Sequence, residues 1–250
     1  MTRELANTYK AIYAGYPVVY RFRIPYTYRY FGSFAQQCEE TSEEILLPEE
    51  IIAGRAALYP EGTKKGYIEY KELIPYTAGH LLRYQCSIFH AVSFIFRGKA
   101  WLLTAPSGTG KTTQYMNWVQ LHPNEIIVIS GDMPVLAMDH GRSIQVCPSP
   151  WNGKEKMGNA VSAELGGIII LNQDKSNSIR FADKKESILT LFSQFMAIPE
   201  SKEEIRILSD MIQRIVAEVP IWVFSNTGTV ESTMVLRQTI EDYLALEVNE

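Results

Sequence analysis

The chain has 250 residues, which is enough for one large domain or for a domain with an appended lobe. With 46% hydrophobic and 21% charged residues it has the composition of a globular protein, and its net charge of −4 provides no basic field for nucleic acid or an anionic membrane. The longest apolar runs, 87–96 and 166–171, are far shorter than the ~20 residues that span a bilayer. The first residues lack the apolar segment of a signal peptide, and the three cysteines have neither metal nor disulfide spacing, so we expect a cytoplasmic protein.

The N-terminal third of the chain is rich in aromatic residues. Residues 12–34 are dense in Tyr, Phe and Arg, and their near-alternation predicts strands that are interrupted at Pro17 and Pro25. An aromatic stacking surface is the alternative interpretation. The acidic stretch 39–51 is typical of a solvated edge. We therefore predict that residues 1–85 form an N-terminal accessory lobe that is mainly β.

The chain from residue 86 onward shows clearer strand and helix patterns. In chain order we expect strands at 87–96 and 100–105, a helix at 111–121, a strand at 125–130 and two strands within 134–149. A short turn separates the members of the first pair and of the last pair. Each pair is therefore expected to form an antiparallel hairpin.

Two capping boxes mark helix starts further along, namely Asp183 with Glu186 and Ser201 with Glu204. The expected elements of this part are a strand at 164–174, helices following each box, a strand at 219–225 and a final helix from about 229. The three helices are expected to bury Ile188, Leu191, Phe192 and Phe195, then Ile205, Leu208, Ile212 and Ile215, and finally Thr233, Leu236, Ile240 and Tyr243.

The stretch "APSGTGKT" at 105–112 matches the phosphate-binding pattern G-x-x-x-x-G-K-[ST], with Ala105 in place of the first glycine. Glycines let the loop backbone turn several N–H groups toward phosphate oxygens, and the following helix adds the partial positive charge of its N-terminus. Lys111 is expected to reach the β and γ phosphates, and the Thr112 hydroxyl to bind Mg²⁺. The alternative is an ordinary glycine-rich turn. The predicted nucleotide-binding residues are Ser107, Gly108, Thr109, Gly110, Lys111, Thr112 and Thr113.

An acidic residue follows the next buried strand. The strand at 125–130 ends at Gly131 and Asp132. An aspartate in this place holds Mg²⁺ or accepts the proton of an attacking hydroxyl; the alternative is a turn-forming role. The hairpins on either side distinguish this arrangement from the parallel sheets of Ras-like and RecA-like proteins, and predict a phosphate-binding loop set in a mixed sheet.

These motifs together resemble the superfamily of HPr kinase and ATP-dependent phosphoenolpyruvate carboxykinase, in particular its short HPr-kinase-related members. "SGTGKTT" (107–113) is similar to the carboxykinase loop, and "FHAVSFIFRGKAWLLTAPSGTGKTT" (89–113) to the histidine-containing strand, turn and loop of HPr kinases. "ISGDMPVL" (129–136) resembles their aspartate-bearing strand end, and "PSPWNGKE" (148–155) followed by "LGGIIIL" resembles the short members. The resemblance implies an α/β fold for 86–250, with a mixed, partly antiparallel sheet and a P-loop-containing carboxykinase-like catalytic core.

The resemblance also implies roles for further residues. His90 stands where HPr kinases have an active-site histidine, so it would stabilise charge on the transferring phosphoryl group; the alternative is a buried strand histidine. Lys154 would bind a substrate or phosphate anion, with a solvated loop lysine as the alternative, and Arg180 is a weaker candidate for the same task. HPr kinases have two adjacent aspartates where this chain has Gly131 and Asp132, and their phosphorylase signature is not recognisable here. The resemblance therefore does not extend to phosphorolysis or to HPr as the acceptor.

From the motifs we expect an enzyme that binds ATP or GTP with Mg²⁺ and transfers the γ-phosphoryl group to a hydroxyl of a peptide, a protein or a small molecule. The catalytic residues would be Asp132, His90 and Lys111, with Thr112 and Asp132 on the metal. A P-loop ATPase or nucleotide-binding regulator without an acceptor is the alternative, and an interaction module with a vestigial site is a third. Neither nucleic acid nor a membrane is an expected partner. The acceptor and the oligomeric state stay open, a homo-oligomer included.

Overall fold

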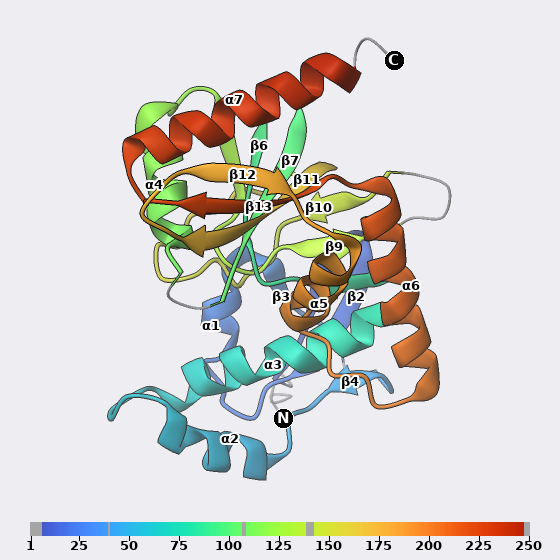
Figure 1. Cartoon of the computed structure of the whole chain (residues 1–250). Coiled ribbons are helices and arrows are strands. Elements are labelled where there is room, and N and C mark those ends of the chain that lie inside the picture. Colours follow the sequence, from blue (N-terminus) through green and yellow to red (C-terminus); the bar gives the residue numbers. More distant parts are fainter. Residues whose placement is uncertain (1–6, 40, 107–108, 139–142, 248–250) are drawn as a thin grey trace, which may run out of the picture.

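The computed structural model describes residues 7–39, 41–106, 109–138 and 143–247, with side chains to residue 246. It contains two mixed sheets, a small one near the N-terminus and a large one around which the C-terminal helices lie (Figure 1). None of the helices within these ranges has both the length and the apolar character needed to cross a membrane.

The small sheet has the strand order β3-β1-β2-β4 and is built from β1 (Thr8–Tyr13), β2 (Tyr16–Arg21), β3 (Ala35–Gln37) and β4 (Glu44–Ile45). A two-residue turn joins β1 to β2, and its residues Ala14 and Gly15 have φ values of +50° and +90°. Such turns require positive φ at both positions, because only then does their twist match that of the strands. β4 pairs parallel to β2, whereas the other pairs are antiparallel, so the sheet is mixed.

The expectation of a mainly β N-terminal lobe is wrong, because helices follow β2. They are α1 (Tyr28–Phe31), the 3₁₀ turns η1 (Gly32–Phe34) and η2 (Ala56–Leu58), α2 (Glu49–Arg55) and α3 (Lys65–Leu82). The buried carboxylate of Glu69 on α3 accepts hydrogen bonds from the backbone N–H groups of Arg23 and Ile24, at 2.7 and 3.0 Å. Those N–H groups are thereby unavailable to a neighbouring strand, and the alternating pattern does not continue as β structure beyond β2.

The large sheet follows the path β5-β9-β10-β11-β7-β6-β8, with β13 beside β11 and β12 beside β13. Its strands are β5 (Cys86–Ile88), β6 (Val92–Phe96), β7 (Lys99–Thr104), β8 (Ile126–Ser130), β9 (Val135–Ala137), β10 (Gln145–Cys147), β11 (Ala163–Gln173), β12 (Ser178–Phe181) and β13 (Ile221–Asn226). β11 is parallel to β7 and β13, while β6–β7 and β9–β10 are antiparallel. The predicted mixed sheet and both hairpins are confirmed, although the turn of the second hairpin, at 139–142, lies outside the described residues. The single strand expected at 87–96 is wrong: it is divided into β5, which pairs with β9, and β6, which forms the hairpin with β7.

The C-terminal helices begin where the capping boxes predict. They are α5 (Lys184–Gln194) and α6 (Lys202–Glu218), which accompany α4 (Lys111–Leu121) and α7 (Val230–Glu247). The side chain of Asp183 accepts from the N–H of Glu186 at 2.8 Å, and the side chain of Ser201 accepts from the N–H of Glu204 at 3.2 Å. Most predicted core positions are at least partly buried.

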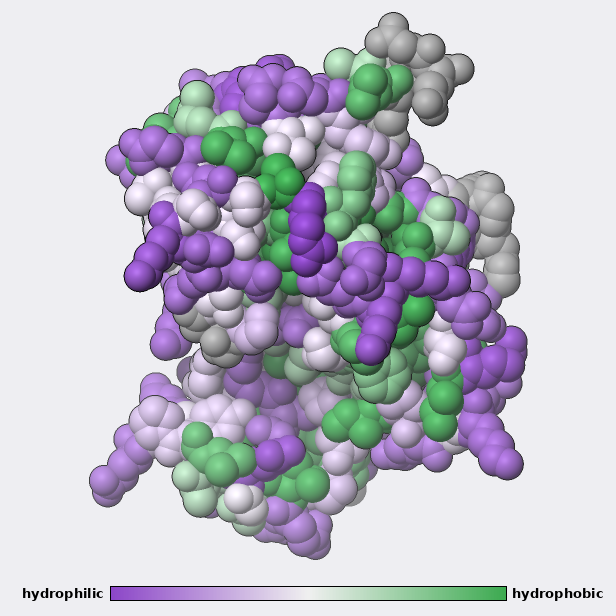
Figure 2. All heavy atoms as spheres, viewed as in Figure 1, coloured by the Kyte–Doolittle hydropathy of each residue, from purple (hydrophilic) through white to green (hydrophobic). Residues whose placement is uncertain are grey.

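Two predicted core residues face solvent instead. Phe192 on α5 is 58% exposed and Ile205 on α6 is 53% exposed. Successive residues of a helix are rotated by about 100° around its axis, so Phe192, which follows the buried Leu191, points away from the core. Ile205 stands in the first turn of α6, one turn before the buried stripe begins at Leu208. On the face drawn in Figure 2, apolar residues occur in small groups among hydrophilic ones.

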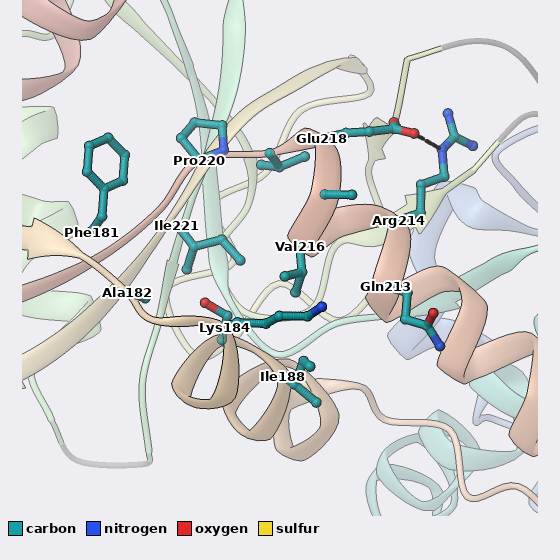
Figure 3. A pocket seen from close by; sticks show the side chains of 13 residues that line it. Phe181, Ala182, Lys184, Ile188, Gln213, Arg214, Val216, Glu218, Pro220 and Ile221 are labelled. Atoms are coloured by element: carbon teal, nitrogen blue, oxygen red, sulfur yellow. Dashed lines mark hydrogen bonds and ion pairs between the residues drawn. The ribbon is translucent and has the colours of Figure 1, made fainter.

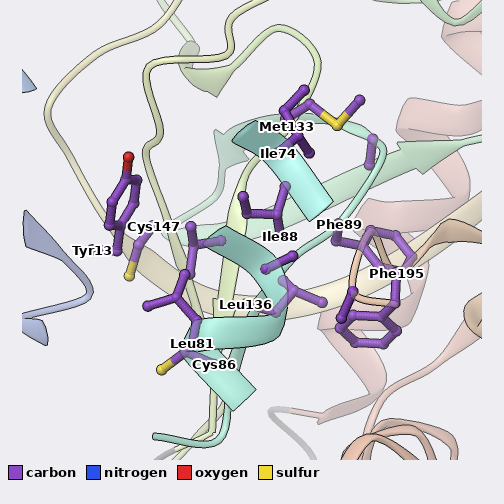
Figure 4. Close-up of a cluster of buried hydrophobic side chains, with 14 of the residues drawn as sticks. Tyr13, Ile74, Leu81, Cys86, Ile88, Phe89, Met133, Leu136, Cys147 and Phe195 are labelled. Carbon is purple, nitrogen blue, oxygen red and sulfur yellow. The ribbon is translucent and has the colours of Figure 1, made fainter. Parts of the chain in front are cut away.

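Two apolar clusters cover opposite faces of the large sheet. β7 alternates between them, since Leu102 belongs to one cluster, and Trp101 and Leu103 belong to the other, which α4 and α7 cover. The first cluster also takes in β1, β2 and α3, and Figure 4 shows Ile74 and Leu81 of α3 beside Ile88 and Leu136 of the large sheet. The sequence division at residue 85 therefore runs through a shared core, and residues 1–85 contribute directly to covering the large sheet.

Candidate functional site

The topology of the large sheet brings three segments to one edge. β6 is antiparallel to both β7 and β8, so the carboxyl ends of β7 and β8 lie at the same edge as the amino end of β6. The loop from Ala105 to Gly110 follows β7, Asp132 follows β8, and His90 precedes β6. Residues that are far apart in the sequence thus meet, as the strand assignments predict.

The loop after β7 leads directly into α4. Gly110 is the N-cap of this helix with φ +93°, a left-handed conformation that residues with a Cβ rarely adopt. Thr109 closes the loop locally, because its hydroxyl donates to the carbonyl of Pro106 at 2.7 Å. Thr112 and Thr113 are exposed in the first turn of α4. The loop residues Ser107 and Gly108 lie outside the described residues.

Lys111 is the buried cation of this loop. Its Nζ donates to the carbonyl of Ala105 at 2.6 Å, and the carbonyl of Pro106 lies 3.5 Å away. Burial lowers the pKa of Lys111, and the negative charge of Asp132 partly opposes this shift. The ammonium group therefore lies close to the loop backbone, within the field of Asp132, where an incoming anion would improve its charge balance.

Two nitrogen atoms flank the carboxylate of Asp132. Nε2 of His90 lies 3.5 Å from Oδ1, and Nζ of Lys71 lies 3.8 Å from Oδ2. The turn that carries Asp132 is held by Ser130, whose hydroxyl oxygen accepts from the N–H groups of Asp132 and Met133 at 3.4 and 3.2 Å. The sequence motifs identified His90 and Asp132 but missed Lys71, which lies on α3, a helix in a segment for which the sequence predicted no element.

The segment "PSPWNGKE" forms a loop beside Asp132 and is anchored by Trp151. This side chain is buried and lies against Tyr70, Phe31 and Tyr13, with ring-centroid distances of 5.8, 5.5 and 6.0 Å. Its indole N–H donates to the carbonyl of Tyr70 at 2.9 Å. Lys154, four residues from Pro150, is exposed and lines the same cleft as Asp132, without a carboxylate partner among the described residues.

This loop explains the glycine before Asp132. A Cβ on Gly131 would approach the backbone oxygen of Asn152 to 2.7 Å and that of Met157 to 3.1 Å. Real side chains do not tolerate such distances to backbone atoms, so the loop leaves no room for a second aspartate at 131. The turn after β8 consequently carries a single carboxylate, that of Asp132.

His90, Lys111, Asp132, Lys71 and Lys154 line one cleft of about 1000 Å³. Residues of α1, η1 and α3 also line this cleft, so the segment before residue 85 forms part of the site. The charged residues lining it are basic at Arg29, Lys71, Lys111, Lys154 and Lys156, and acidic at Asp132 and Glu155. A cationic excess in a chain of net charge −4 favours an anionic ligand here.

A metal ion in this cleft would need ligands from its substrate. No group of three or more His, Cys, Asp or Glu residues able to hold a metal occurs in the described part of the chain. Mg²⁺ is commonly held by one or two carboxylates together with substrate phosphates and water. The hydroxyl of Thr112 and the carboxylate of Asp132, both lining the cleft, fit that donor set.

Arg180 does not lie with the other candidate residues. It is on β12, where its guanidinium pairs with both carboxylate oxygens of Glu186 at 2.9 and 3.0 Å. Near it is a second hollow, of about 780 Å³, between β12, α5 and α6 (Figure 3). The polar groups shown there include Arg214 and Glu218, which pair with each other at 3.0 Å. Arg180 is therefore paired with Glu186, the glutamate of the capping box, and lies outside the cleft.

Comparisons with protein families, curated proteins and solved structures gave different outcomes. A scan against protein-family models found no match, and a search of curated proteins found none. The chain is similar to the structure of the Hpr(Ser) kinase/phosphatase from Coxiella burnetii, at 15% identity and a TM-score of 0.39, over 66% of this chain and 99% of that chain. The resemblance to HPr kinases lies in the sequence motifs at 89–113 and 129–136.

Proposed function

We propose that this protein is a Mg²⁺-dependent phosphotransferase that moves the γ-phosphoryl group of ATP or GTP to a hydroxyl of a peptide, a protein or a small molecule. The observation that carries the proposal is the meeting of the Lys111 loop with Asp132 at one edge of the large sheet. A loop that leads into a helix N-terminus binds phosphate, and a carboxylate beside it serves a metal or an attacking hydroxyl.

Nucleotide binding is assigned to the loop after β7 and the first turn of α4. The eleven-residue helix α4 presents its free N–H groups and partial positive charge at Gly110. Lys111 would give up its hydrogen bond to the carbonyl of Ala105 and bind the β and γ phosphates instead. A hydrogen bond from the ammonium group to a charged phosphate is stronger than one to a neutral carbonyl. Thr112 and Asp132 would hold Mg²⁺, which neutralises charge on the phosphate oxygens when bound.

The transfer step balances with Asp132 as the proton acceptor. The oxygen of the acceptor hydroxyl forms a bond to the γ phosphorus as the bond to the bridging oxygen breaks, and the electron pair leaves with the nucleoside diphosphate. The hydroxyl proton passes to the carboxylate oxygen of Asp132 that does not bind the metal ion. His90, 3.5 Å from Oδ1, orients this carboxylate and stabilises the charge around it. Lys154, which lines the cleft, would bind an anionic part of either substrate.

A nucleotide hydrolase is the second candidate, and the openness of the site favours it. Thr112, Thr113 and Lys154 are exposed to solvent, so water also has access to the position of the γ-phosphate. A kinase has to favour its acceptor over this water.

The test is to follow labelled γ-phosphate from ATP and from GTP into peptides, free serine and threonine, and small alcohols. Label in an acceptor, formed faster than free phosphate, is the result we expect. Label released only as free phosphate, at one rate with and without every acceptor, would favour the hydrolase.

A further inference from the structure

Lys71 is a cation in the cleft to which the sequence motifs give no role. It lies on α3, lines the cleft, and has its Nζ 3.8 Å from Oδ2 of Asp132. Its side chain is 26% exposed, so it is neither a solvated surface lysine nor a fully enclosed one. Within the described ranges Asp132 is its one ion-pair partner.

The pairing of Lys71 with Asp132 is loose. Hydrogen bonds between ammonium and carboxylate groups are about 2.7–2.9 Å long, and at 3.8 Å the two groups attract without a directed bond. No hydrogen bond of the Lys71 ammonium occurs among the residues that the structure describes. An ammonium group has three donors on a flexible stem, so it is able to turn toward a second anion in the cleft.

The backbone of Lys71 is held more firmly than its side chain. The preceding residue, Tyr70, accepts from the indole of Trp151 at 2.9 Å and donates its hydroxyl to the carbonyl of Pro150 at 2.7 Å. Two residues before Lys71, the buried Glu69 binds the segment that follows β2. The helix turn that carries Lys71 is thus fixed against the loop beside Asp132, which is the preorganisation that charge stabilisation requires.

Asp132 cannot keep its present pairing during catalysis. Once it accepts a proton or binds a metal ion, its negative charge no longer balances that of Lys71. The charge that develops on the transferring phosphoryl group is then a new partner for Lys71 within the cleft, since phosphoryl transfer spreads charge over three equatorial oxygens. Lys111 reaches these oxygens from the loop after β7, and Lys71 approaches from α3, another element that lines the cleft.

We propose that Lys71 is a catalytic residue that binds the transferring phosphoryl group in the transition state, so that α3 completes the active site. This inference rests on the proposed function. It predicts a contact that strengthens during the reaction, and therefore an effect on turnover larger than the effect on nucleotide affinity.

The experiment compares Lys71→Met and Lys71→Arg with the wild type and with Lys65→Met, an exposed lysine in the first turn of the same helix. Three quantities are measured: the rate of γ-phosphate transfer to an acceptor or to water, the affinity for Mg-ATP, and the affinity for Mg-ADP with tetrafluoroaluminate. We expect K71M to lower turnover and tetrafluoroaluminate binding about 10²-fold while Mg-ATP affinity changes less than about threefold. K71R should recover to within about tenfold of the wild type, and K65M should match it.

Two results would overturn the inference. One is unchanged turnover in K71M, which would make Lys71 a counter-ion of Asp132 alone. The other is an equal loss of Mg-ATP and tetrafluoroaluminate binding, which would make it a ground-state contact. Lys71→Gln, which keeps a polar side chain, replaces K71M if that variant does not fold. If the wild type only hydrolyses ATP, the kinase proposal fails, whereas Lys71 is still judged by hydrolysis and by tetrafluoroaluminate binding.

Discussion

Tyr70 and Trp151 join α3 to the loop beside Asp132 through two hydrogen bonds. The indole N–H of Trp151 donates to the carbonyl of Tyr70 at 2.9 Å, and the hydroxyl of Tyr70 donates to the carbonyl of Pro150 at 2.7 Å. Because the two rings also stack at 5.8 Å, this pair sets the distance between the wall formed by the N-terminal segment and the rest of the cleft.

Trp151→Phe should disturb the cleft as well as the core. The variant leaves the carbonyl of Tyr70 without its donor and creates a small cavity, so we expect the free energy of unfolding to fall by about 1–3 kcal/mol. Trp101→Phe is the matched control, because the Trp101 indole also donates to a backbone carbonyl, that of Phe96 at 3.0 Å, in the other cluster. Denaturant unfolding should show comparable losses, with phosphoryl transfer lowered only in W151F. Equal transfer by both variants would contradict a role of Trp151 in shaping the site.

Gly131→Ala should be destabilising despite its small size. The added Cβ would approach the backbone oxygen of Asn152 to 2.7 Å, and relieving that overlap should cost about 1–3 kcal/mol and displace Asp132. Gly79→Ala provides the control, because a Cβ at 79 meets no atom within 4 Å and lies inside α3, where alanine is favoured. Thermal unfolding should move in opposite directions for the two variants. A G131A protein as stable as the wild type would show that the backbone around Asn152 moves aside at little cost in free energy.

Lys111→Ala tests the phosphate-binding loop by itself. The variant removes a charge-assisted contact to the phosphates worth about 2–3 kcal/mol, which corresponds to a loss of Mg-ATP affinity of tens-fold or more. Calorimetric titration measures this loss. Thermal stability without nucleotide should not fall much, since burial already disfavours the charged form of Lys111 and lowers its pKa. Unchanged affinity would mean that the loop does not bind phosphate.

His80 on α3 should make stability depend on pH. Burial, with a further contribution from the charge of Arg83, lowers the pKa of His80 from its ordinary value of 6.5. The unfolded chain therefore binds a proton more readily than the folded one, so this contribution to stability is complete above pH 6.5 and is lost progressively below it. In thermal unfolding, the wild type should lose more stability between neutral pH and pH of about 5 than His80→Gln. Parallel losses in the two proteins would contradict the shift.

The features predicted from the sequence are those that depend on residues close together in the chain. The loop at Lys111, the two capping boxes and the β6–β7 hairpin each use a short pattern with a local physical cause. The position of Asp132 followed because a strand end fixes where the next residue lies relative to a neighbouring strand. The family resemblance suggested Lys154 as a site residue, and Lys154 lines the cleft.

The features that were missed depend on tertiary contacts. α3 contains Pro75, which has no N–H to offer the carbonyl of Lys71 one turn earlier, and such a residue argues against a helix when only the sequence is considered. The end of the strand pattern after β2 depends on Glu69, which is distant in the sequence. Lys71 could be recognised as a site residue only from the three-dimensional structure, in which α3 lies beside Asp132.

The most direct test of the account is Asp132→Asn, which keeps the size of the side chain and removes its charge. Titration with Mg-ATP and transfer of labelled γ-phosphate to an acceptor are measured on the same preparation. The account predicts that nucleotide affinity stays within about tenfold of the wild type, because the loop and α4 carry most of the binding, while transfer falls by a factor of about 10² or more. Transfer by D132N at the wild-type rate would contradict the account, because Asp132 would then serve neither the metal nor the attacking hydroxyl.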